Sequence, residues 1–247
     1  MEELKPDYIN LEHINLSFDK SGYCVLSSST VIEWLKCSKE ELADLATTWD
    51  DLPNDNYLKD GGHYRYRRHG SFTFENYSLI KIPHRAHWQP LDYNALHGGI
   101  ERWFEPVKDS TLKKTAWEKI LRQFALTACS VLGYETEKLF IEAHQFRIDT
   151  THGIGRPTPE GAHRDGVDFV AVFMVNRNNI KGGETRVFDA DGRYGERFTL
   201  DEPWSLLLLD DARVIHESTP IQPLQTSGYR DTLVLTLRKN NFQMPAD

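Results

Sequence analysis

Two histidines and one aspartate are the residues of this sequence best suited to hold a metal ion. His163 and Asp165 are separated by one residue, so in an extended segment their side chains lie on the same face. His216 follows an apolar stretch and a turn at Asp210-Asp211, and we expect it on a neighbouring strand facing the same cavity. Two imidazoles and one carboxylate bind non-haem iron(II) and leave coordination positions open, although a catalytic zinc uses the same ligand types. We therefore predict a metal site at His163, Asp165 and His216.

An arginine further along the chain offers a second binding function. Arg230 opens a predicted strand in which residues 230, 232, 234 and 236 (Arg, Thr, Val and Thr) share one face. A buried guanidinium and buried hydroxyls need partners, and a guanidinium pairs with a carboxylate through two parallel hydrogen bonds. We predict that Arg230 and Thr232 bind the distal carboxylate of an organic acid such as 2-oxoglutarate. The alternative is a solvated arginine at the end of a strand.

Five other polar side chains are candidates for binding a primary substrate. Gln145 and Arg147 share strand parity, so both point to one face. If that face lines a cavity, the arginine would bind a substrate carboxylate, and a structural ion pair is an equally good interpretation. Arg65, Arg67 and Asn94 are further candidates for binding the backbone of an amino acid, and each taken alone also fits a structural or exposed position.

The elements that must position these residues change character near residue 135. Before it, helical signals dominate: capping-box spacing begins two short helices at Thr30 and Ser38, and an amphipathic helix runs over about 110–132, with Gly133 as its C-cap. A strand is expected at 22–26. After residue 135, short strands alternate with Gly, Pro and Asp turns. The candidate strands are 139–148, 168–175, 184–188, 205–209, 214–218 and 231–237.

Several short strands without a βαβ pattern predict a mainly β fold with flanking helices. A double-stranded β-helix, which is a cupin-like jelly roll, fits this pattern. We expect residues 1–247 to form a single domain. In it, a helix-rich part (about 1–135) would pack on a β-helix core (about 136–238).

Composition limits the classes of partner. The 247 residues are 39% hydrophobic and 27% charged, as in ordinary globular proteins. The formal net charge of -8 argues against a nucleic-acid partner. Three cysteines without a CxxC motif disfavour a disulfide framework or a thiolate zinc site. The acidic N-terminus has no signal-peptide pattern and no apolar run reaches membrane-spanning length, so we expect a cytoplasmic protein without membrane contact. Nothing in the sequence specifies an oligomeric state.

Four segments taken together resemble a known family. They are Pro-Glu-Gly-Ala-His-Arg-Asp-Gly-Val-Asp at 159–168, Gly-Gly-Glu-Thr at 182–185, His-Glu-Ser-Thr-Pro at 216–220 and Arg-Asp-Thr-Leu at 230–233. This set is similar to the 2-oxoglutarate/iron dioxygenases that hydroxylate free L-amino acids, and most of all to their L-isoleucine dioxygenase branch. Residues 65–67, 93–102 and 144–147 share the resemblance more loosely, so that it covers about residues 60–238.

The resemblance implies a function as well as a fold. Iron(II) would be held by His163, Asp165 and His216, and 2-oxoglutarate by Arg230. The implied reaction uses O₂ to convert 2-oxoglutarate to succinate and CO₂ and hydroxylates an unactivated C–H bond. We therefore expect a dioxygenase whose partner is a small molecule, namely a free L-amino acid or a related metabolite. Two alternatives stay open: a non-catalytic cupin-like metal-binding module, and an oxygenase that acts on a residue of a protein.

Overall fold

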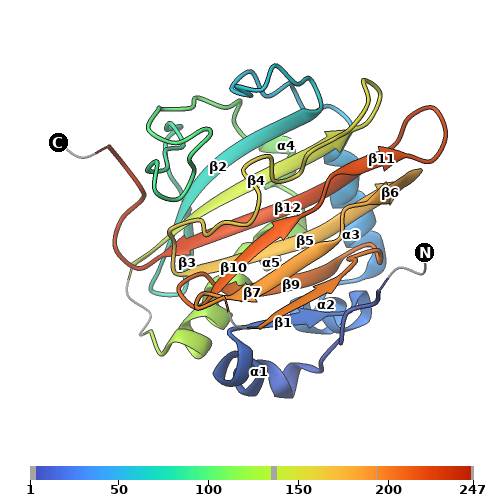
Figure 1. Ribbon diagram of the computed structural model, residues 1–247. Coiled ribbons are helices and arrows are strands. Elements are labelled where there is room, and N and C mark those ends of the chain that lie inside the picture. Colours follow the sequence, from blue (N-terminus) through green and yellow to red (C-terminus); the bar gives the residue numbers. More distant parts are fainter. Residues whose placement is uncertain (1–3, 135–137, 193, 246–247) are drawn as a thin grey trace.

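The centre of the molecule is a large antiparallel β-sheet (Figure 1). The computed structural model describes residues 4–134, 138–192 and 194–245. Within these residues the sheet has seven strands in the order β1-β9-β5-β12-β4-β2-β3. Their bounds are β1 Tyr23–Leu26, β9 Ser205–Asp210, β5 Phe169–Asn178, β12 Tyr229–Arg238, β4 Leu139–Asp149, β2 Arg65–Glu75 and β3 Ser78–Lys81.

A smaller sheet covers part of one face of the large sheet. It consists of β10 (Val214–Ser218), β7 (Thr185–Asp189) and β8 (Gly195–Phe198), and a short pair joins β11 (Ile221–Pro223) to β6 (Ile180–Gly182). Apolar side chains of both sheets form one buried cluster. It joins Val187 and Phe198 of the smaller sheet to Val170 and Leu209 of the large sheet. The mainly β fold with antiparallel sheets, predicted as a jelly roll, is confirmed.

Helices cover the opposite face of the large sheet, behind it and along its lower edge in Figure 1. Their bounds are η1 Leu11–His13, α1 Ile14–Ser21, α2 Ser28–Leu35, α3 Lys39–Ala46, η2 Thr47–Trp49, α4 Asp109–Leu112 and α5 Thr115–Leu132. The apolar face of α5, including Trp117 and Phe124, joins strand residues such as Phe169 and Leu235 in the main core. Because this face is filled by apolar side chains, a polar site has room only on the other face.

The predicted elements correspond closely to the observed ones, with two corrections at helix ends. The helix expected over about 110–132 is divided into α4 and α5 at Lys113 and Lys114. The N-cap of α2 is Ser27, the first of the four candidate caps at 27–30, and its hydroxyl accepts a hydrogen bond from the Thr30 backbone N–H; the capping-box spacing had pointed to Thr30. The capping box of Ser38 and the left-handed C-cap at Gly133 are confirmed.

Strand β2 was not predicted, and it changes how the chain is organised. Its first half, Arg-Tyr-Arg-Arg-His, is a basic run without the pattern of a strand, and alternate side chains of this stretch are buried. With β1 and β3 it places three strands from the first 135 residues in the same sheet as β4, β5, β9 and β12. The helix-rich part and the β core therefore share one sheet, and the boundary expected near residue 135 falls in the undescribed range 135–137.

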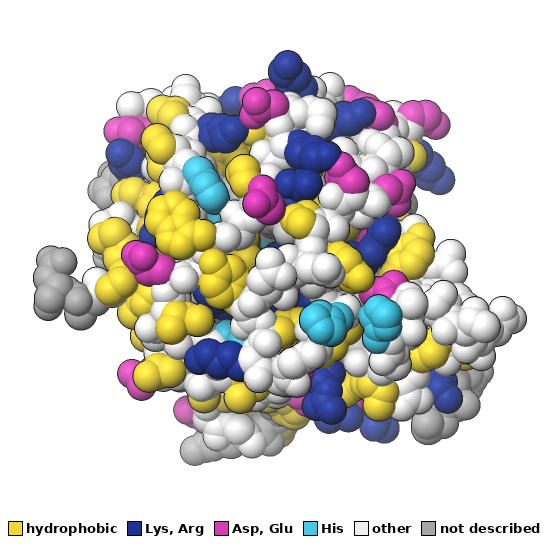
Figure 2. All heavy atoms as spheres, turned by 90° about the horizontal axis from the view of Figure 1, so that it is seen from above, with side chains coloured by type: hydrophobic (Ala, Val, Ile, Leu, Met, Phe, Trp, Pro, Cys, Tyr) yellow, Lys and Arg dark blue, Asp and Glu magenta, His cyan; other side chains and the backbone are white. Residues whose placement is uncertain are grey.

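The surface seen from the top of Figure 1 mixes side chains of all kinds (Figure 2). Lys and Arg side chains are interspersed with Asp, Glu and hydrophobic side chains on this face and do not form a continuous basic surface. In the described part of the chain, no helix is both long enough and apolar enough to cross a membrane.

Candidate metal centre and active site

His163 and His216 are brought together by backbone pairing. The two residues form an antiparallel bridge, in which each backbone N–H donates to the other's carbonyl oxygen at 3.0 and 2.9 Å. Side chains of directly paired residues lie on the same face of a sheet. The two imidazole rings accordingly lie with their centroids 4.9 Å apart. The expectation that residues 163 and 216 lie side by side is met by the geometry.

Asp165 completes a group of three potential ligands. Its Oδ1 lies 3.6 Å from His163 Nε2 and its Oδ2 lies 3.7 Å from His216 Nε2. The ligand atoms of the three side chains all lie within 4.8 Å of one another. Metal–nitrogen and metal–oxygen bonds of about 2.0–2.2 Å at right angles place ligand atoms about 3 Å apart. A small inward movement of these side chains would therefore give a three-ligand site with open positions, as an iron(II) oxygenase needs.

Hydrogen bonding and charge prepare this group for a cation. His163 Nδ1 lies 3.0 Å from the Gly161 carbonyl oxygen and can donate a hydrogen bond to it. In that tautomer the proton is on Nδ1, so the Nε2 atom, which faces Asp165, is free to bind a metal ion. Burial opposes ionisation of His163, but the adjacent Asp165 carboxylate outweighs it and raises the His163 pKa to about 9. Burial and the neighbouring His163 lower the pKa of His216 to about 4. Despite its burial, contact with His163 lowers the Asp165 pKa to about 2. The carboxylate is ionised, and a metal ion would replace the imidazole proton beside it.

Asp211 holds the backbone that carries Asp165. Its two carboxylate oxygens accept hydrogen bonds from the backbone N–H groups of Asp165, Gly166 and Val167 at 2.9, 2.8 and 3.0 Å. Its side chain is fully buried, and burial, followed by the charge of Asp165, raises its pKa to about 7. Sequence reasoning treated Asp210-Asp211 as a turn and gave Asp211 no role in the site.

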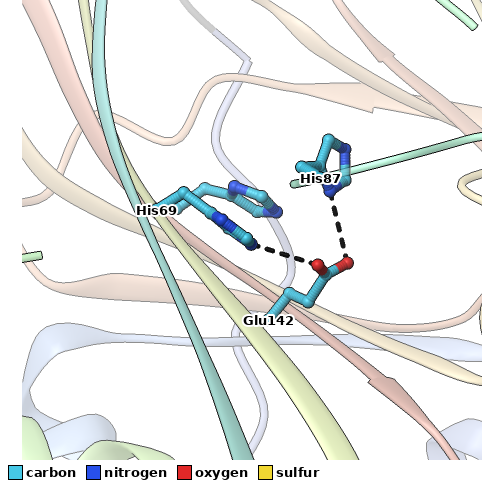
Figure 3. Close-up of side chains that lie close together, drawn as sticks. His69, His87 and Glu142 are labelled. Atoms are coloured by element: carbon cyan, nitrogen blue, oxygen red, sulfur yellow. Dashed lines mark hydrogen bonds and ion pairs between the residues drawn. The ribbon is translucent and has the colours of Figure 1, made fainter. Parts of the chain in front are cut away.

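A second group of potential ligands, His69, His87, Glu142 and His144, lies nearby (Figure 3). Both oxygens of Glu142 already accept hydrogen bonds, from His69 Nε2 at 3.1 Å and from His87 Nδ1 at 3.2 Å. A guanidinium nitrogen of Arg85 lies 2.7 Å from Glu142 Oε1.

Guanidinium groups make this second group unsuitable for a metal ion. Arg67 donates to His144 Nδ1 at 2.7 Å, so two of the four potential ligands are bound to arginine. A divalent cation placed among them would be repelled at close range. Among the described residues, the group of His163, Asp165 and His216 is therefore the better metal centre.

One cavity connects the metal centre to the predicted co-substrate residues. It encloses about 1010 Å³ including its open mouth, and Arg230, Thr232, Val234 and Thr236 all line it together with the three potential ligands. The intervening residues Leu233, Leu235 and Leu237 point into the main core. Arg230 is 4% exposed, and burial followed by the charge of Arg177 lowers its pKa to about 10. It donates to Ser218 Oγ at 3.3 Å, while its Nε has no hydrogen-bond partner among the described residues.

Two of the five residues predicted to bind the substrate do not reach the cavity. Gln145 and Arg147 do share a face of β4, but this face is turned away: Gln145 donates to Thr48 Oγ1 at 2.9 Å, and Arg147 pairs with Asp231 at 2.8 and 2.7 Å. We therefore withdraw both from the substrate site, and the structural ion pair is the correct interpretation of Arg147. The alternate residues of β4, such as His144, line the cavity instead.

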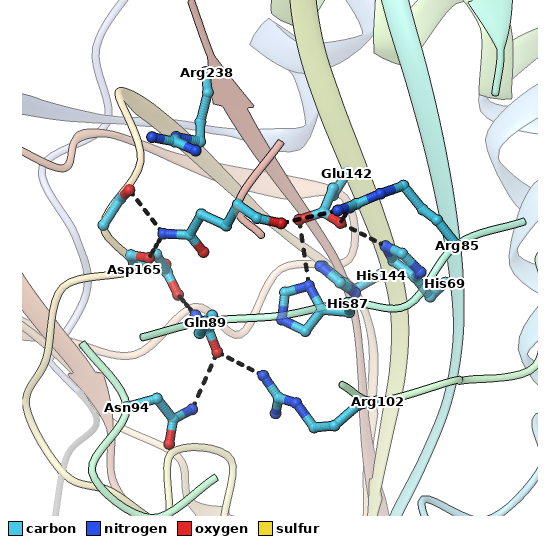
Figure 4. A network of polar contacts seen from close by, with 12 residues as sticks. His69, Arg85, His87, Gln89, Asn94, Arg102, Glu142, His144, Asp165 and Arg238 are labelled. Atoms are coloured by element: carbon cyan, nitrogen blue, oxygen red, sulfur yellow. Dashed lines mark hydrogen bonds and ion pairs between the residues drawn. The ribbon is translucent and has the colours of Figure 1, made fainter. Parts of the chain in front are cut away.

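The remaining substrate candidates, Arg65, Arg67 and Asn94, do line the cavity. Asn94 belongs to a polar network around Gln89 that sequence reasoning missed (Figure 4). Gln89 is its central residue. Its carbonyl oxygen accepts hydrogen bonds from Arg102 at 2.8 Å and from Asn94 at 3.1 Å, and its amide nitrogen donates to Asp165 Oδ1 at 3.4 Å. Gln89 therefore links these side chains to a potential metal ligand. It lies in a segment without regular secondary structure, so periodicity gave no signal for it.

Comparison with known proteins identifies the family. The family model described as 2OG-Fe dioxygenase matches residues 46–236. The chain belongs to this family. It is a 2-oxoglutarate-dependent non-haem iron dioxygenase, and its family uses iron(II), 2-oxoglutarate and O₂. The donor set of His163, Asp165 and His216, with no arginine bound to it in the described structure, fits an iron(II) ion.

Solved structures of similar proteins agree with the fold. The dioxygenase is 47% identical to a bsmA homolog from Methylobium petroleophilum PM1, with a TM-score of 0.92 and 98% of each chain covered. It is also similar to IDO from Bacillus thuringiensis (21% identity, TM-score 0.73, 98% of this chain and 100% of that chain). The Fe(II)/α-ketoglutarate-dependent dioxygenase TqaL is 19% identical, with a TM-score of 0.71 and 94% and 89% coverage. The last two comparisons show the fold alone. No curated protein matches the sequence.

Proposed function

We propose that this dioxygenase, acting as a single domain, hydroxylates a free L-amino acid or a closely related small metabolite. In this proposal iron(II) is held by His163, Asp165 and His216, and 2-oxoglutarate is held by Arg230 with Thr232. When iron(II) and 2-oxoglutarate are bound, such a centre supplies the chemistry that converts 2-oxoglutarate and O₂ to succinate and CO₂ and oxidises a substrate C–H bond.

The observation that carries the proposal is that a single cavity holds two separate sets of unused binding groups. One set is the three potential metal ligands together with the buried Arg230, whose Nε lacks a partner in the described residues. The other set is Arg65 and Arg67, each of which keeps one guanidinium nitrogen without a partner among the described residues, with Asn94 beside them, whose amide is already bound to Gln89 and to the His97 backbone. An iron ion bound together with one organic acid would leave the second set available. A small polar co-reactant is the simplest occupant for it.

The side chains around the cavity favour a small substrate over a residue of a protein. Arg65, Arg67 and Asn94 are 6%, 4% and 5% exposed, so a ligand that contacts them must enter the molecule. These side chains line the same cavity as the three potential metal ligands and Arg230, so a ligand bound to them would lie inside the molecule beside the metal centre. The role of the surrounding chain is to orient both molecules and exclude water.

The test is a screen of the standard amino acids and of short peptides for substrate-dependent succinate release, with mass spectrometry of the products. We expect one class of free amino acid, or a related metabolite, to give stoichiometric succinate and a product heavier by one oxygen atom. Turnover of peptides alone would contradict the proposed substrate class. Anaerobic addition of iron(II) and 2-oxoglutarate gives an independent measurement, because a visible charge-transfer band is expected whether or not a substrate is known.

A further inference from the structure

Three buried arginines face the cavity without enough negative charge to match them. We call Arg65, Arg67 and Arg102 the basic cluster; all three line the cavity and are 6%, 4% and 2% exposed. Arg67 lies between two aromatic rings, with its guanidinium carbon 3.6 Å from the Phe104 ring centroid and 4.4 Å from that of Phe146. These rings hold the guanidinium in place but supply no negative charge.

Donor groups of the basic cluster are unused. Arg65 Nη2, Arg67 Nε and Arg102 Nε are buried nitrogens without a hydrogen-bond partner in the parts of the chain that the structure describes. A buried guanidinium N–H with no acceptor is costly, because the group has lost its water and gained nothing in return. Three such donors in one cavity indicate that a ligand with several acceptor oxygens completes them.

The nearby carboxylates do not neutralise the cluster. Asp55 Oδ2 lies 2.7 Å from Arg65 Nε and 3.7 Å from Arg67 Nη1, and it is a single negative charge shared by two arginines. Glu142 is already bound by Arg85 at 2.7 Å. Arg102 donates to the neutral amide of Gln89.

Glu160 and Glu217 also line the cavity, and Glu217 is paired with Arg186. Glu160 Oε1 lies 3.7 Å from His163 Nε2, its Oε2 has no partner among the described residues, and its charge also acts on Arg102. Three guanidinium groups against the carboxylates of Asp55 and Glu160 leave an excess of one positive charge in the cluster.

This excess sets the charge of the substrate. A neutral amino acid carries one carboxylate and one ammonium, so its binding cannot reduce the net charge of the cavity. We propose that the primary substrate is a net anion, an acidic amino acid or an amino acid whose amine is acylated, with a carboxylate bound by Arg65, Arg67 and Arg102. This inference rests on the proposed function and narrows it, since guanidinium groups favour carboxylates through paired, charge-assisted hydrogen bonds.

The first arm of the test uses the unaltered enzyme and pairs of ligands that differ in net charge, two of them nearly identical in shape. Calorimetry on protein loaded with iron(II) and 2-oxoglutarate under anaerobic conditions compares L-glutamate with L-glutamine, L-aspartate with L-asparagine, and N-acetyl-L-leucine with L-leucine. We expect the anionic member of at least one pair to bind about tenfold tighter or more, as a charge-assisted hydrogen bond predicts. The pair that responds distinguishes an acidic side chain from an acylated amine. Equal or tighter binding of the neutral member in all three pairs would overturn the proposal.

The second arm uses Arg102→Gln, with Arg68→Gln as the matched control. Arg68 lies on β2 beside Arg67 but donates to the carbonyl oxygens of Pro106 and Asp51 outside the cavity. For the preferred anion we expect R102Q to raise the Kd and KM by about 10- to 100-fold while kcat changes less, because uniform binding is lost. R68Q should leave both values within about twofold of wild type.

The visible band separates the possible failures. A raised Kd for the anion in R102Q, together with a normal band and an unchanged 2-oxoglutarate requirement, shows that the variant is folded and that the cluster serves the primary substrate; an unchanged Kd for the anion would overturn the proposal. A raised 2-oxoglutarate requirement in R102Q would overturn the inference, since the cluster would then bind the co-substrate. Absence of the band and of succinate in the unaltered enzyme would instead contradict the proposed function, while the calorimetric ligand pairs would still report the charge preference of the cavity.

Discussion

Removing the Asp211 carboxylate is expected to damage the metal centre without touching a metal ligand. Asp211 accepts three backbone hydrogen bonds, from residues 165, 166 and 167, at 2.8–3.0 Å, and it is fully buried. In Asp211→Ala these three N–H groups lose their acceptor, and each buried donor left unpaired costs about 1–3 kcal/mol. The substitution also removes the cost of burying a charge, which is why the Asp211 pKa is raised to about 7. The net loss of unfolding free energy is therefore about 2–4 kcal/mol.

Asp211→Asn sharpens this prediction. Its amide keeps one carbonyl acceptor, but its NH₂ group must face at least one of the same backbone donors. We expect the unfolding free energy to fall by about 1–2 kcal/mol, so that the stability of this variant lies between those of the wild type and the alanine variant. Iron affinity should fall about 10- to 100-fold in both variants, because the backbone that orients the Asp165 side chain is released.

The assay combines urea unfolding of the metal-free protein, followed by tryptophan fluorescence, with iron titration of the visible band. Asp210→Asn is the matched control, since this neighbouring carboxylate accepts from the backbone of Ala212 at 3.0 Å, whereas the backbone N–H groups of residues 165–167 donate to Asp211. The reasoning is refuted if D211A unfolds at the same urea concentration as D210N and reaches its full band at the same iron concentration.

The other predictions concern the ligands and their supports. His163→Ala should abolish the anaerobic iron–2-oxoglutarate band, whereas substitution of the exposed His13 should not; a retained band would remove His163 from the ligand set. Arg230→Ala should raise the 2-oxoglutarate requirement about 100-fold with iron still bound, because a buried charge loses its partner, and an unchanged requirement in a succinate assay would contradict this. Gln89→Leu should weaken substrate coupling, seen as succinate formed without hydroxylated product, and fully coupled turnover would count against a positioning role. Gly166→Ala should lower the urea midpoint, because φ is +73° and the new Cβ would collide with the Tyr93 ring; an unchanged midpoint would show that the loop adapts.

Local sequence patterns were sufficient wherever polar and apolar side chains are separated onto the two faces of an element, or wherever a motif is short. The two-residue period of an extended chain was enough to predict that the side chains of His163 and Asp165 share a face. The same period along β12 predicted that Arg230 shares a face with Thr232. In that strand the alternation of polar residues with Leu233, Leu235 and Leu237 identifies the core face without a structure. The six strands predicted after residue 138 were located to within three residues at either end, whereas the short strands β6, β8 and β11 were not predicted.

The same period could not decide which face of β4 lines the cavity. Both faces of this strand are buried, one against the helices and one against the cavity, so polar and apolar side chains occur on each. Gln145 and Arg147 were correctly placed on a common face, but the sequence carries no signal that distinguishes a face covered by helices from one that borders a ligand. The partners of Arg147 come from β12 and from the loop after η2, far away along the chain.

What the sequence by itself determined is the pair His163 and Asp165, the polar face of the strand at Arg230 and the β architecture that carries them, because each depends on neighbours within a few residues; the distant His216 was a candidate supported by the resemblance to a family, and the fold pairs it with His163. Only the tertiary structure decided the rest of the cavity. Arg65 and Arg67 look like a basic surface run until β2 pairs with β4, and Gln89 and Arg102 reach the cavity from an irregular segment. Their positions depend on which distant segments pack together. Long-range packing produces no periodic pattern in the sequence of the residues that it brings into contact.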